Sequence, residues 1–224
     1  MGNRYDTQEK LISAARRIII DEGAEGTSLE HICKVAGFTR GAFYSNFASK
    51  DSLLAALAED EYALLIDRLR QTVDTWVAQG RHAQGDGNPL LIEDLLFEAL
   101  DAIGVNKDLY ILHSELLMRS IRDPEWGQRL LAINLEFVDE LSKVLVWILD
   151  AAGRELTKPL RAMTHSVIGI VMRAAGISAW RSSMERPKVV DLDSDAVPSV
   201  RNSSAHEIVE VVLDVLYMSS KERS

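Results

Sequence analysis

The side chains best suited to binding chemistry gather between residues 40 and 50. Arg40, Tyr44, Ser45 and Asn46 lie within two helical turns of one another, and Lys50 follows shortly after. Guanidinium, ammonium, hydroxyl and amide groups are the donors that contact phosphates and base edges in nucleic acids. A lysine in the first turn of a helix opposes the helix dipole, so Lys50 suits a phosphate contact better than helix stability. The spacing therefore predicts a surface for nucleic acid.

Two short helices are expected to position these side chains. The first begins after the Thr27–Ser28 cap and ends at Gly37, a residue that tolerates positive φ. The second is capped by Thr39 and runs from Arg40 to about Asn46. Two short helices joined by a three-residue turn are typical of a helix-turn-helix, which presents its second helix to the major groove.

A longer helix in front of them is expected to complete a three-helix bundle. Asp6 and Glu9 have capping-box spacing, so this helix should start at Asp6 or Thr7 and end at Gly23. The apolar residues expected to hold the two short helices against it are Ile32, Ala36, Phe38, Phe43 and Phe47.

The run TSLEHICKVAGFTRGAFYSNFASKDSLL, residues 27–54, resembles the DNA-binding domain of the TetR family. The family pattern is roughly T-T-hydrophobic-x-x-I-A-x-x-A-G-hydrophobic-S-x-G-x-hydrophobic-Y-x-H-F-x-[ST]-K-E-x-L. This chain departs from it at Cys33, Thr39 and Asn46, where alanine, serine and histidine are usual. The first two replacements are nearly isosteric, whereas Asn46 alters a position expected to face outward.

The resemblance implies a role for each matching residue. Thr27 and Ser28 would bind a phosphate at a helix N-terminus. Thr39 would open the recognition helix, and Arg40 would make a bidentate contact to guanine. The remaining implied contacts are close approach at Gly41, a phosphate or sugar contact from Tyr44, outward donors at Ser45 and Asn46, and a phosphate clamp at Lys50.

Each of these residues also has a simpler interpretation. Thr27, Ser28, Thr39 and Ser49 could be plain helix caps. Arg40 and Lys50 could be solvated charges, and Tyr44 could be half-buried packing. The joint spacing favours DNA contact over these separate readings. Cys33, in contrast, lies on an apolar helix face and is expected to be core.

The rest of the chain is expected to form long helices separated by loops over 80–89 and 183–202. The expected ranges are Lys50 to about Trp76, Leu90–Ile103, Lys107–Ile121, Pro124–Ala152, Lys158–Arg181 and Ser204–Ser219. The predicted fold class is therefore all-α, with an N-terminal helix-turn-helix domain over residues 1–50. A larger C-terminal helical domain for effector binding and dimerisation would cover residues 51–224.

The resemblance implies a homodimer, formed through the last two long helices, that binds double-stranded operator DNA. Gly169 and Gly176 lie on one face of the first of these helices, and the final helix has a wide apolar stripe. Burial of both helices inside one subunit is the alternative. Repression is the commonest mode of action in the family, with release by a small-molecule effector that the sequence does not identify.

An effector pocket would be lined by large or polarisable side chains, although each of them is also a reasonable core residue. The predicted lining residues are Phe97, Tyr110, His113, Met118, Phe137, Met172 and Trp180. Glu115, Glu136 and Glu140 could meet a cationic ligand if they were buried, but solvent exposure is the favoured interpretation.

Composition excludes several other classes of protein. The net charge of −9 is uneven, because residues 1–50 hold seven basic and six acidic side chains while the remaining residues hold 18 and 28. An acidic body joined to a neutral or weakly basic head can still bind DNA at the head. With one cysteine, no disulfide framework or thiolate metal site is expected. His165 and Arg173 interrupt the most apolar stretch, so a cytoplasmic protein without a membrane span is predicted.

Enzymatic signatures are missing from the sequence. It contains no His-Glu-x-x-His, P-loop, Gly-x-Ser-x-Gly or Gly-x-Gly-x-x-Gly motif, and no histidine has glutamate three residues before it. No metal, cofactor or catalytic residue is therefore expected. The rival hypotheses are an all-helical adaptor that does not bind DNA and an all-helical enzyme built from scattered residues.

Overall fold

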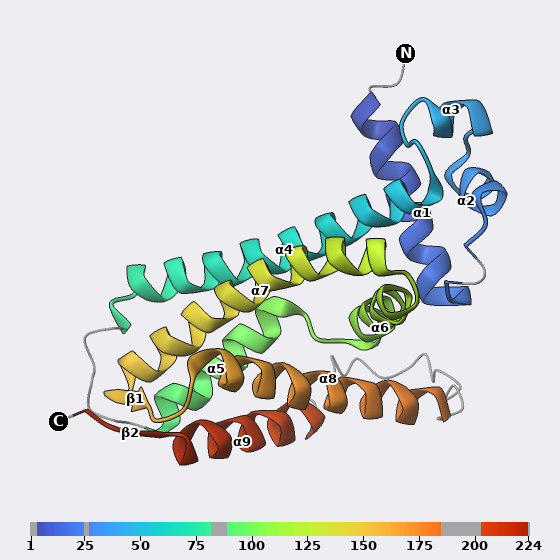
Figure 1. The fold of residues 1–224 in the computed structure, drawn as a ribbon. Helices are drawn as coiled ribbons and strands as arrows, with labels where there is room; N and C mark the ends of the chain where they lie inside the picture. The colour runs from blue at the N-terminus through green and yellow to red at the C-terminus, as the bar shows by residue number, and fades with distance from the viewer. Residues whose placement is uncertain (1–3, 25–26, 82–88, 185–202, 224) are drawn as a thin grey trace, which may run out of the picture. The chain divides into compact units, whose positions relative to one another are not determined.

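The computed structural model describes residues 4–24, 27–81, 89–184 and 203–223, and within these ranges the chain is almost entirely helical (Figure 1). The helices are α1 (Arg4–Glu22), α2 (Leu29–Ala36), α3 (Arg40–Tyr44), α4 (Lys50–Ala78), α5 (Pro89–Ile103), α6 (Lys107–Arg122), α7 (Pro124–Ala151), α8 (Leu160–Met184) and α9 (Ser203–Met218). The all-α prediction is confirmed, and most helix ends lie within two residues of those expected. The predicted loop at 183–202 falls almost wholly outside the described residues.

Three features differ from the expectation. α1 already includes Arg4, so Asp6 lies in its first turn, where its charge complements the helix dipole, and does not cap it. α8 runs to Met184, three residues beyond the expected end. Two three-residue strands, β1 (Arg154–Leu156) and β2 (Ser220–Glu222), pair antiparallel. They are too short to leave a period-two pattern in the sequence.

The chain divides into two compact units. The first comprises residues 1–67 and 108–137, and the second comprises residues 68–107 and 138–224. α4 and α7 each begin in the first unit and end in the second. A functional boundary at residue 50 therefore stays a prediction.

The head of the first unit is built around the buried face of α1. Leu11 and Ala15 of α1 are fully buried, as are Ile32 of α2 and Phe43 of α3. Phe43 packs against Phe47, with ring centroids 5.8 Å apart. Complete burial of a phenylalanine stabilises a core by several kcal/mol, about 3 to 5 on truncation to alanine. The predicted core of the head is confirmed at Ile32, Phe43 and Phe47, while Ala36 and Phe38 are half-buried.

The second unit is organised by aromatic and aliphatic packing between helices. Trp76 of α4 is fully buried and stacks on Trp147 of α7, with ring centroids 4.9 Å apart. α9 packs against both α5 and α8, burying Val209, Val212 and Leu216. The strand pair ties the start of α8 to the end of α9, so these two helices run antiparallel.

α8 is the one helix among the described residues that is long and apolar enough to cross a membrane by length and composition. We expected His165 and Arg173 to make this helix too polar to be a candidate membrane span, and that expectation is wrong by length and composition. The core helix of a soluble protein has the same composition, but α8 is unusual because only 28% of its most apolar stretch is buried. Its exposed apolar surface needs another explanation.

Candidate nucleic-acid interface

Capping residues define the two short helices of the head. Ser28 precedes α2, and its hydroxyl accepts a hydrogen bond from the backbone N–H of His31 at 3.1 Å. Gly37 ends α2 with φ of 75°, a left-handed conformation that glycine adopts without strain. The backbone N–H of Gly37 donates to the carbonyl of Lys34, and that of Phe38 donates to the carbonyl of Cys33, which caps the C-terminus of α2. The chain can therefore reverse within three residues and start α3, as predicted.

Thr39 opens α3 as expected. Its hydroxyl oxygen accepts from the backbone N–H of Ala42 at 3.2 Å, which satisfies one of the free donors at the helix N-terminus. Phe43 anchors α3 to the core, so the residues on the opposite side of the helix are turned outward. α3 is thus a short helix fixed at its buried side and open at its polar side.

Arg40 and Tyr44 lie one turn apart on α3, and both side chains are exposed. The Arg40 side chain is 61% exposed and Tyr44 is 54% exposed. Arg40 forms an ion pair of 2.8 Å with Glu30 of α2. Tyr44, and then Glu30, raise the pKa of the Arg40 guanidinium, which therefore keeps its charge. The ion pair with Glu30 therefore orients the Arg40 side chain.

Gly41, Ser45 and Ser28 are also exposed. A Cβ on Gly41 would meet only the Thr39 hydroxyl, at 3.7 Å, so nothing within the head requires glycine here. Ser45 donates its hydroxyl to the carbonyl of Gly41 at 2.9 Å. Glycine at an exposed, unstrained helical position is consistent with close approach of an external surface.

Two of the predicted contacts are placed differently from the expectation. Thr27 is only 1% exposed, and its hydroxyl donates to the carbonyl of Gly23 at 3.2 Å, so its side chain is structural in this state. Asn46 is half-buried, and its amide donates to the carbonyl of Ala42 at 2.8 Å, so it does not face outward as expected. Both side chains donate to the backbone carbonyl four residues earlier. Such local bonds compete with outward contacts, and the family pattern does not show which of the two forms.

Lys50 is the first residue of α4, at a helix N-terminus that Ser49 and Ser52 cap by bonding to each other. The Ser49 hydroxyl accepts from the backbone N–H of Ser52 at 3.1 Å, and the Ser52 hydroxyl accepts from the backbone N–H of Ser49 at 3.0 Å. Within the described part of the chain Lys50 has no ion pair, whereas its neighbour Asp51 pairs with Arg119 of α6. The cap and this ion pair hold the first turn of α4, which carries Lys50 at its start.

Cys33 is a core residue, as predicted. It is 4% exposed, and burial, the largest cause, raises the pKa of its thiol. A neutral thiol packed among aliphatic side chains has neither the charge nor the access that thiolate chemistry requires.

The predicted effector residues do not form one group. His113 and Phe137 come together in the first unit around Tyr62 of α4, a residue that the sequence interpretation missed. The Tyr62 hydroxyl is 3.1 Å from Nδ1 of His113 and accepts from the amide of Asn134 at 3.2 Å. Burial lowers the pKa of His113 and raises the pKa of Tyr62, so this cluster is neutral.

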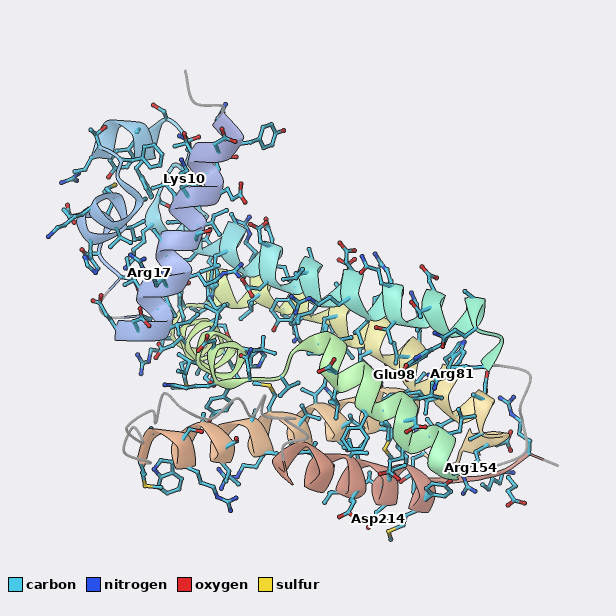
Figure 2. All side chains as sticks on the ribbon, turned by 180° about the vertical axis from the view of Figure 1, so that it is seen from behind. Lys10, Arg17, Arg81, Glu98, Arg154 and Asp214 are labelled. Atoms are coloured by element: carbon cyan, nitrogen blue, oxygen red, sulfur yellow. The ribbon has the colours of Figure 1, made fainter. Side chains whose placement is uncertain are left out.

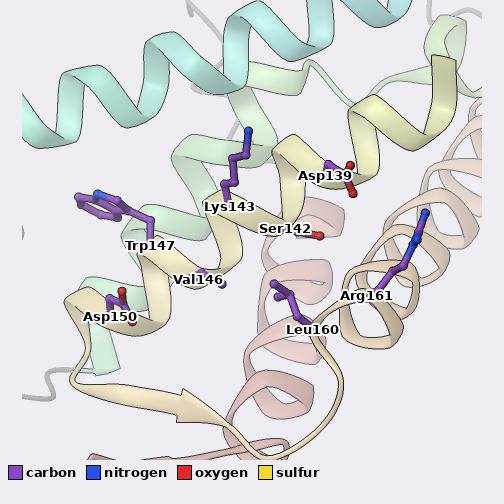
Figure 3. A pocket seen from close by; sticks show the side chains of 8 residues that line it. All are labelled: Asp139, Ser142, Lys143, Val146, Trp147, Asp150, Leu160 and Arg161. Carbon is purple, nitrogen blue, oxygen red and sulfur yellow. The ribbon is translucent and has the colours of Figure 1, made fainter. Parts of the chain in front are cut away.

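The other predicted lining residues are scattered. Met118 is 47% exposed in the first unit, where Tyr110 is half-buried, and Trp180 is 65% exposed in the second unit, where Phe97 and Met172 are half-buried. A hollow of about 640 Å³ lies between α7 and α8, and none of the predicted residues lines it. Figure 3 shows the side chains that do line it. Its lining mixes charges of both signs, Asp139, Lys143, Asp150 and Arg161, around Ser142, Val146, Trp147 and Leu160. A smaller hollow of about 260 Å³ in the first unit includes Met118.

Two of the three carboxylates considered for a ligand serve other partners. Glu115 accepts from the backbone N–H of Ala24 at 3.3 Å. Glu140 is 9% exposed, which contradicts the favoured expectation of solvent exposure, and binds Arg70 at 2.7 Å and Lys143 at 2.8 Å. The hydrogen bond from Arg70 is the main cause that lowers the pKa of Glu140. Glu136 lies at the surface, as expected, and also has an interaction within the chain.

Comparison with known proteins points to one family. Residues 11–57 match the family model for bacterial regulatory proteins of the tetR family. An HTH-type transcriptional regulator of Mycobacterium tuberculosis is 35% identical over 82 residues, 35% of each chain. The HTH-type transcriptional repressor NemR of Escherichia coli is 30% identical over 71 residues, 32% of this chain and 36% of NemR. The alignments thus span about a third of the length of these relatives.

The fold likeness extends over nearly the whole chain. The transcriptional regulator FadR of Bacillus subtilis, solved in complex with stearoyl-CoA, superposes with a TM-score of 0.64 over 93% of this chain and 96% of its own. At 16% identity this likeness concerns the fold alone. The matched family is one of DNA-binding regulators and not of enzymes.

Proposed function

We propose that this chain, a member of the TetR family of transcriptional regulators, binds a palindromic operator as a homodimer and represses transcription until a small-molecule effector releases it. The observation that carries the proposal is α3, a short helix capped by Thr39 and anchored by Phe43. Its exposed side carries Arg40, the residue type that reads guanine with two hydrogen bonds.

In the proposed complex each α3 enters a major groove. The N-terminal residues of a recognition helix reach the base edges, which assigns base reading to Arg40 and backbone contacts to Tyr44 and Lys50. Close approach at Gly41 would bring the helix axis near the groove floor. Glu30 would release Arg40 as the guanidinium turns from the carboxylate to a base.

A dimer accounts for the exposed apolar surface of α8. On the face opposite its buried residues, α8 presents Gly169, where a Cβ would meet nothing within 4 Å, and the exposed Trp180. α9 presents Val211, 49% exposed, and Met218, 86% exposed. A second copy covering these faces would bury them and place two heads on one duplex, about 34 to 36 Å apart for adjacent major grooves.

Effector release is proposed on the likeness to FadR, which binds stearoyl-CoA, and on the polar cluster of Tyr62, His113 and Asn134. An effector can shift the operator affinity only by its difference in affinity for the two protein states, typically about 1 to 3 kcal/mol. The chemical identity of the effector is left open.

Selection of bound sites from random duplex DNA tests the proposal. The expected product is a palindrome bound by two chains, with affinity that falls steeply as salt rises. Arg40→Ala serves as the matched variant, since this exposed residue can be removed without disturbing the core. A folded chain that enriches no sequence and shows no salt-dependent retention on DNA would favour the helical adaptor instead.

A further inference from the structure

The guanidinium assigned to base reading already has a partner on the neighbouring helix. Nη1 of Arg40 on α3 lies 2.8 Å from Oε1 of Glu30 on α2, and the two side chains are 61% and 62% exposed. Both residues belong to the first unit, and Figure 2 shows the head to which α2 and α3 contribute, together with its exposed side chains. Because this ion pair is open to solvent, a bound DNA molecule can reach it and offer the guanidinium another acceptor.

The stability of α2 does not by itself explain this contact. Glu30 lies in the first turn of α2, where a negative charge complements the helix dipole, but that role needs the charge alone and no partner on α3. Lys34, four residues later on α2, is at the usual spacing for a partner of a helical glutamate. Among the described residues no ion pair joins Glu30 to Lys34. Glu30 is thus paired with α3 and not along its own helix.

The ion pair affects correct and incorrect bases differently. In the proposed complex Arg40 leaves Glu30 to bind guanine, so the free energy of the ion pair is subtracted from that of the guanine contact. Opposite another base the guanidinium can stay with Glu30, and nothing is subtracted. Because base discrimination is the difference between these two affinities, an ion pair in the free head reduces it.

We propose that Glu30 is a positioning residue that limits how strongly Arg40 discriminates among bases, because it gives the guanidinium another partner when the base is not guanine. This inference rests on the proposed function and adds a residue that sets its specificity. An exposed ion pair changes an equilibrium constant by about two- to fivefold. A bidentate contact to guanine is worth about five- to 150-fold in discrimination. Glu30 therefore moderates the base preference of Arg40 and does not abolish it.

The test compares two duplexes, the operator selected from random DNA and a version in which the guanine assigned to Arg40 is replaced in one half-site. The readout is the ratio of the two dissociation constants for the full chain. Glu30→Gln should bind the operator more tightly and should raise the ratio by about two- to fivefold, because a neutral amide holds a guanidinium less strongly than a carboxylate does.

Three controls separate the ion pair from a general effect of charge. Glu30→Asp keeps the charge in the first turn of α2, but its shorter side chain withdraws the carboxylate from Arg40, so it should raise the ratio as Glu30→Gln does. Glu9→Gln, at an exposed glutamate of α1, removes the same charge from the head and should leave the ratio unchanged. In an Arg40→Ala background neither change at Glu30 should alter the ratio.

Circular dichroism checks that the variants are folded, and Glu30→Asp still tests the pair if loss of the first-turn charge destabilises Glu30→Gln. A ratio that both Glu30 variants leave unchanged would overturn the inference. A rise in Glu30→Gln alone would do the same, and so would an equal rise in the Arg40→Ala background. A chain that selects no DNA sequence at all would instead refute the proposed function.

Discussion

Arg119 of α6 forms an ion pair with Asp51, the residue that follows Lys50 in the first turn of α4. The same guanidinium lies 5.6 Å from the ring centroid of Trp126, and its side chain is 26% exposed. One turn earlier on α6, Glu115 accepts the backbone N–H of Ala24, just beyond the end of α1. α6 therefore contacts the residues just after α1 and the first turn of α4 through two charged side chains four residues apart.

Replacing Arg119 with alanine should weaken DNA binding, although Arg119 itself is not expected to contact DNA. We expect a loss of about 1 kcal/mol in stability from the ion pair and the cation–π contact, and a loss of a few-fold in operator affinity as the first turn of α4 loosens. Thermal unfolding and a gel-shift titration measure the two effects. Arg122→Ala, an exposed arginine of the same helix, is the control. Equal operator affinity for Arg119→Ala and the control would rule out this positioning role.

Arg40→Ala should relax base preference at one position of each half-site. The expected penalty is about 1 to 3 kcal/mol on the preferred base and little on the others, because a bidentate contact discriminates among bases. Competition binding with single-base operator variants provides the measurement. Uniform weakening across all variants would assign Arg40 to the DNA backbone instead.

Lys50→Ala should weaken all DNA sequences alike. Loss of one phosphate contact lowers the slope of log affinity against log salt by about one unit. Titrations at several salt concentrations measure that slope, and Lys34→Ala, at an exposed lysine of α2, shows how much a general loss of charge contributes. A slope identical to that of the unmodified chain would remove Lys50 from the interface.

Gly127→Ala should destabilise the chain, although alanine normally favours a helix. A Cβ on Gly127, in the first turns of α7, would lie 2.7 Å from the carbonyl oxygen of Ser120 in α6, so backbone must shift. We expect a loss of about 1 to 3 kcal/mol, against a gain of about 0.5 to 1 kcal/mol for alanine at an unhindered helical glycine. Gly41→Ala is the matched comparison, because its Cβ has only an ordinary contact. Urea unfolding should give opposite signs for the two variants.

Glu140 should make stability depend on pH in the acidic range. The hydrogen bond from Arg70 is the main cause that lowers the pKa of the Glu140 carboxyl below 4.5 in the folded chain. As pH falls, Glu140 is therefore protonated in the unfolded chain before it is protonated in the folded chain. The stabilisation is therefore complete above the unfolded pKa and is lost as pH falls through the folded pKa. Glu140→Gln should cost about 1 to 3 kcal/mol at pH 7, and the difference from the unmodified chain should shrink below pH 4.5. A difference that stays constant down to pH 3 would contradict this role.

Local signals in the sequence determined the head. Ser28 and Thr39 cap their helices through hydrogen bonds that span three residues, and Gly37 ends α2 through its own φ. Such signals act within one turn, so their types and spacing were sufficient to predict α2, the turn and α3. Helical periodicity also accounts for the exposure of Gly41 and Ser45, which lie opposite the buried Phe43 on α3.

Only the tertiary structure decided which side chains meet across helices. Arg70 binds Glu140, Arg119 binds Asp51, and Tyr62 joins His113 to Asn134, although each pair is separated by more than fifty residues along the chain. No period in the sequence encodes such contacts, because they depend on how the long helices cross. Thr27 and Asn46 show that local contacts can also be hard to predict. Each side chain could bond either to solvent or to a nearby backbone carbonyl, and its burial in the folded chain decides for the carbonyl.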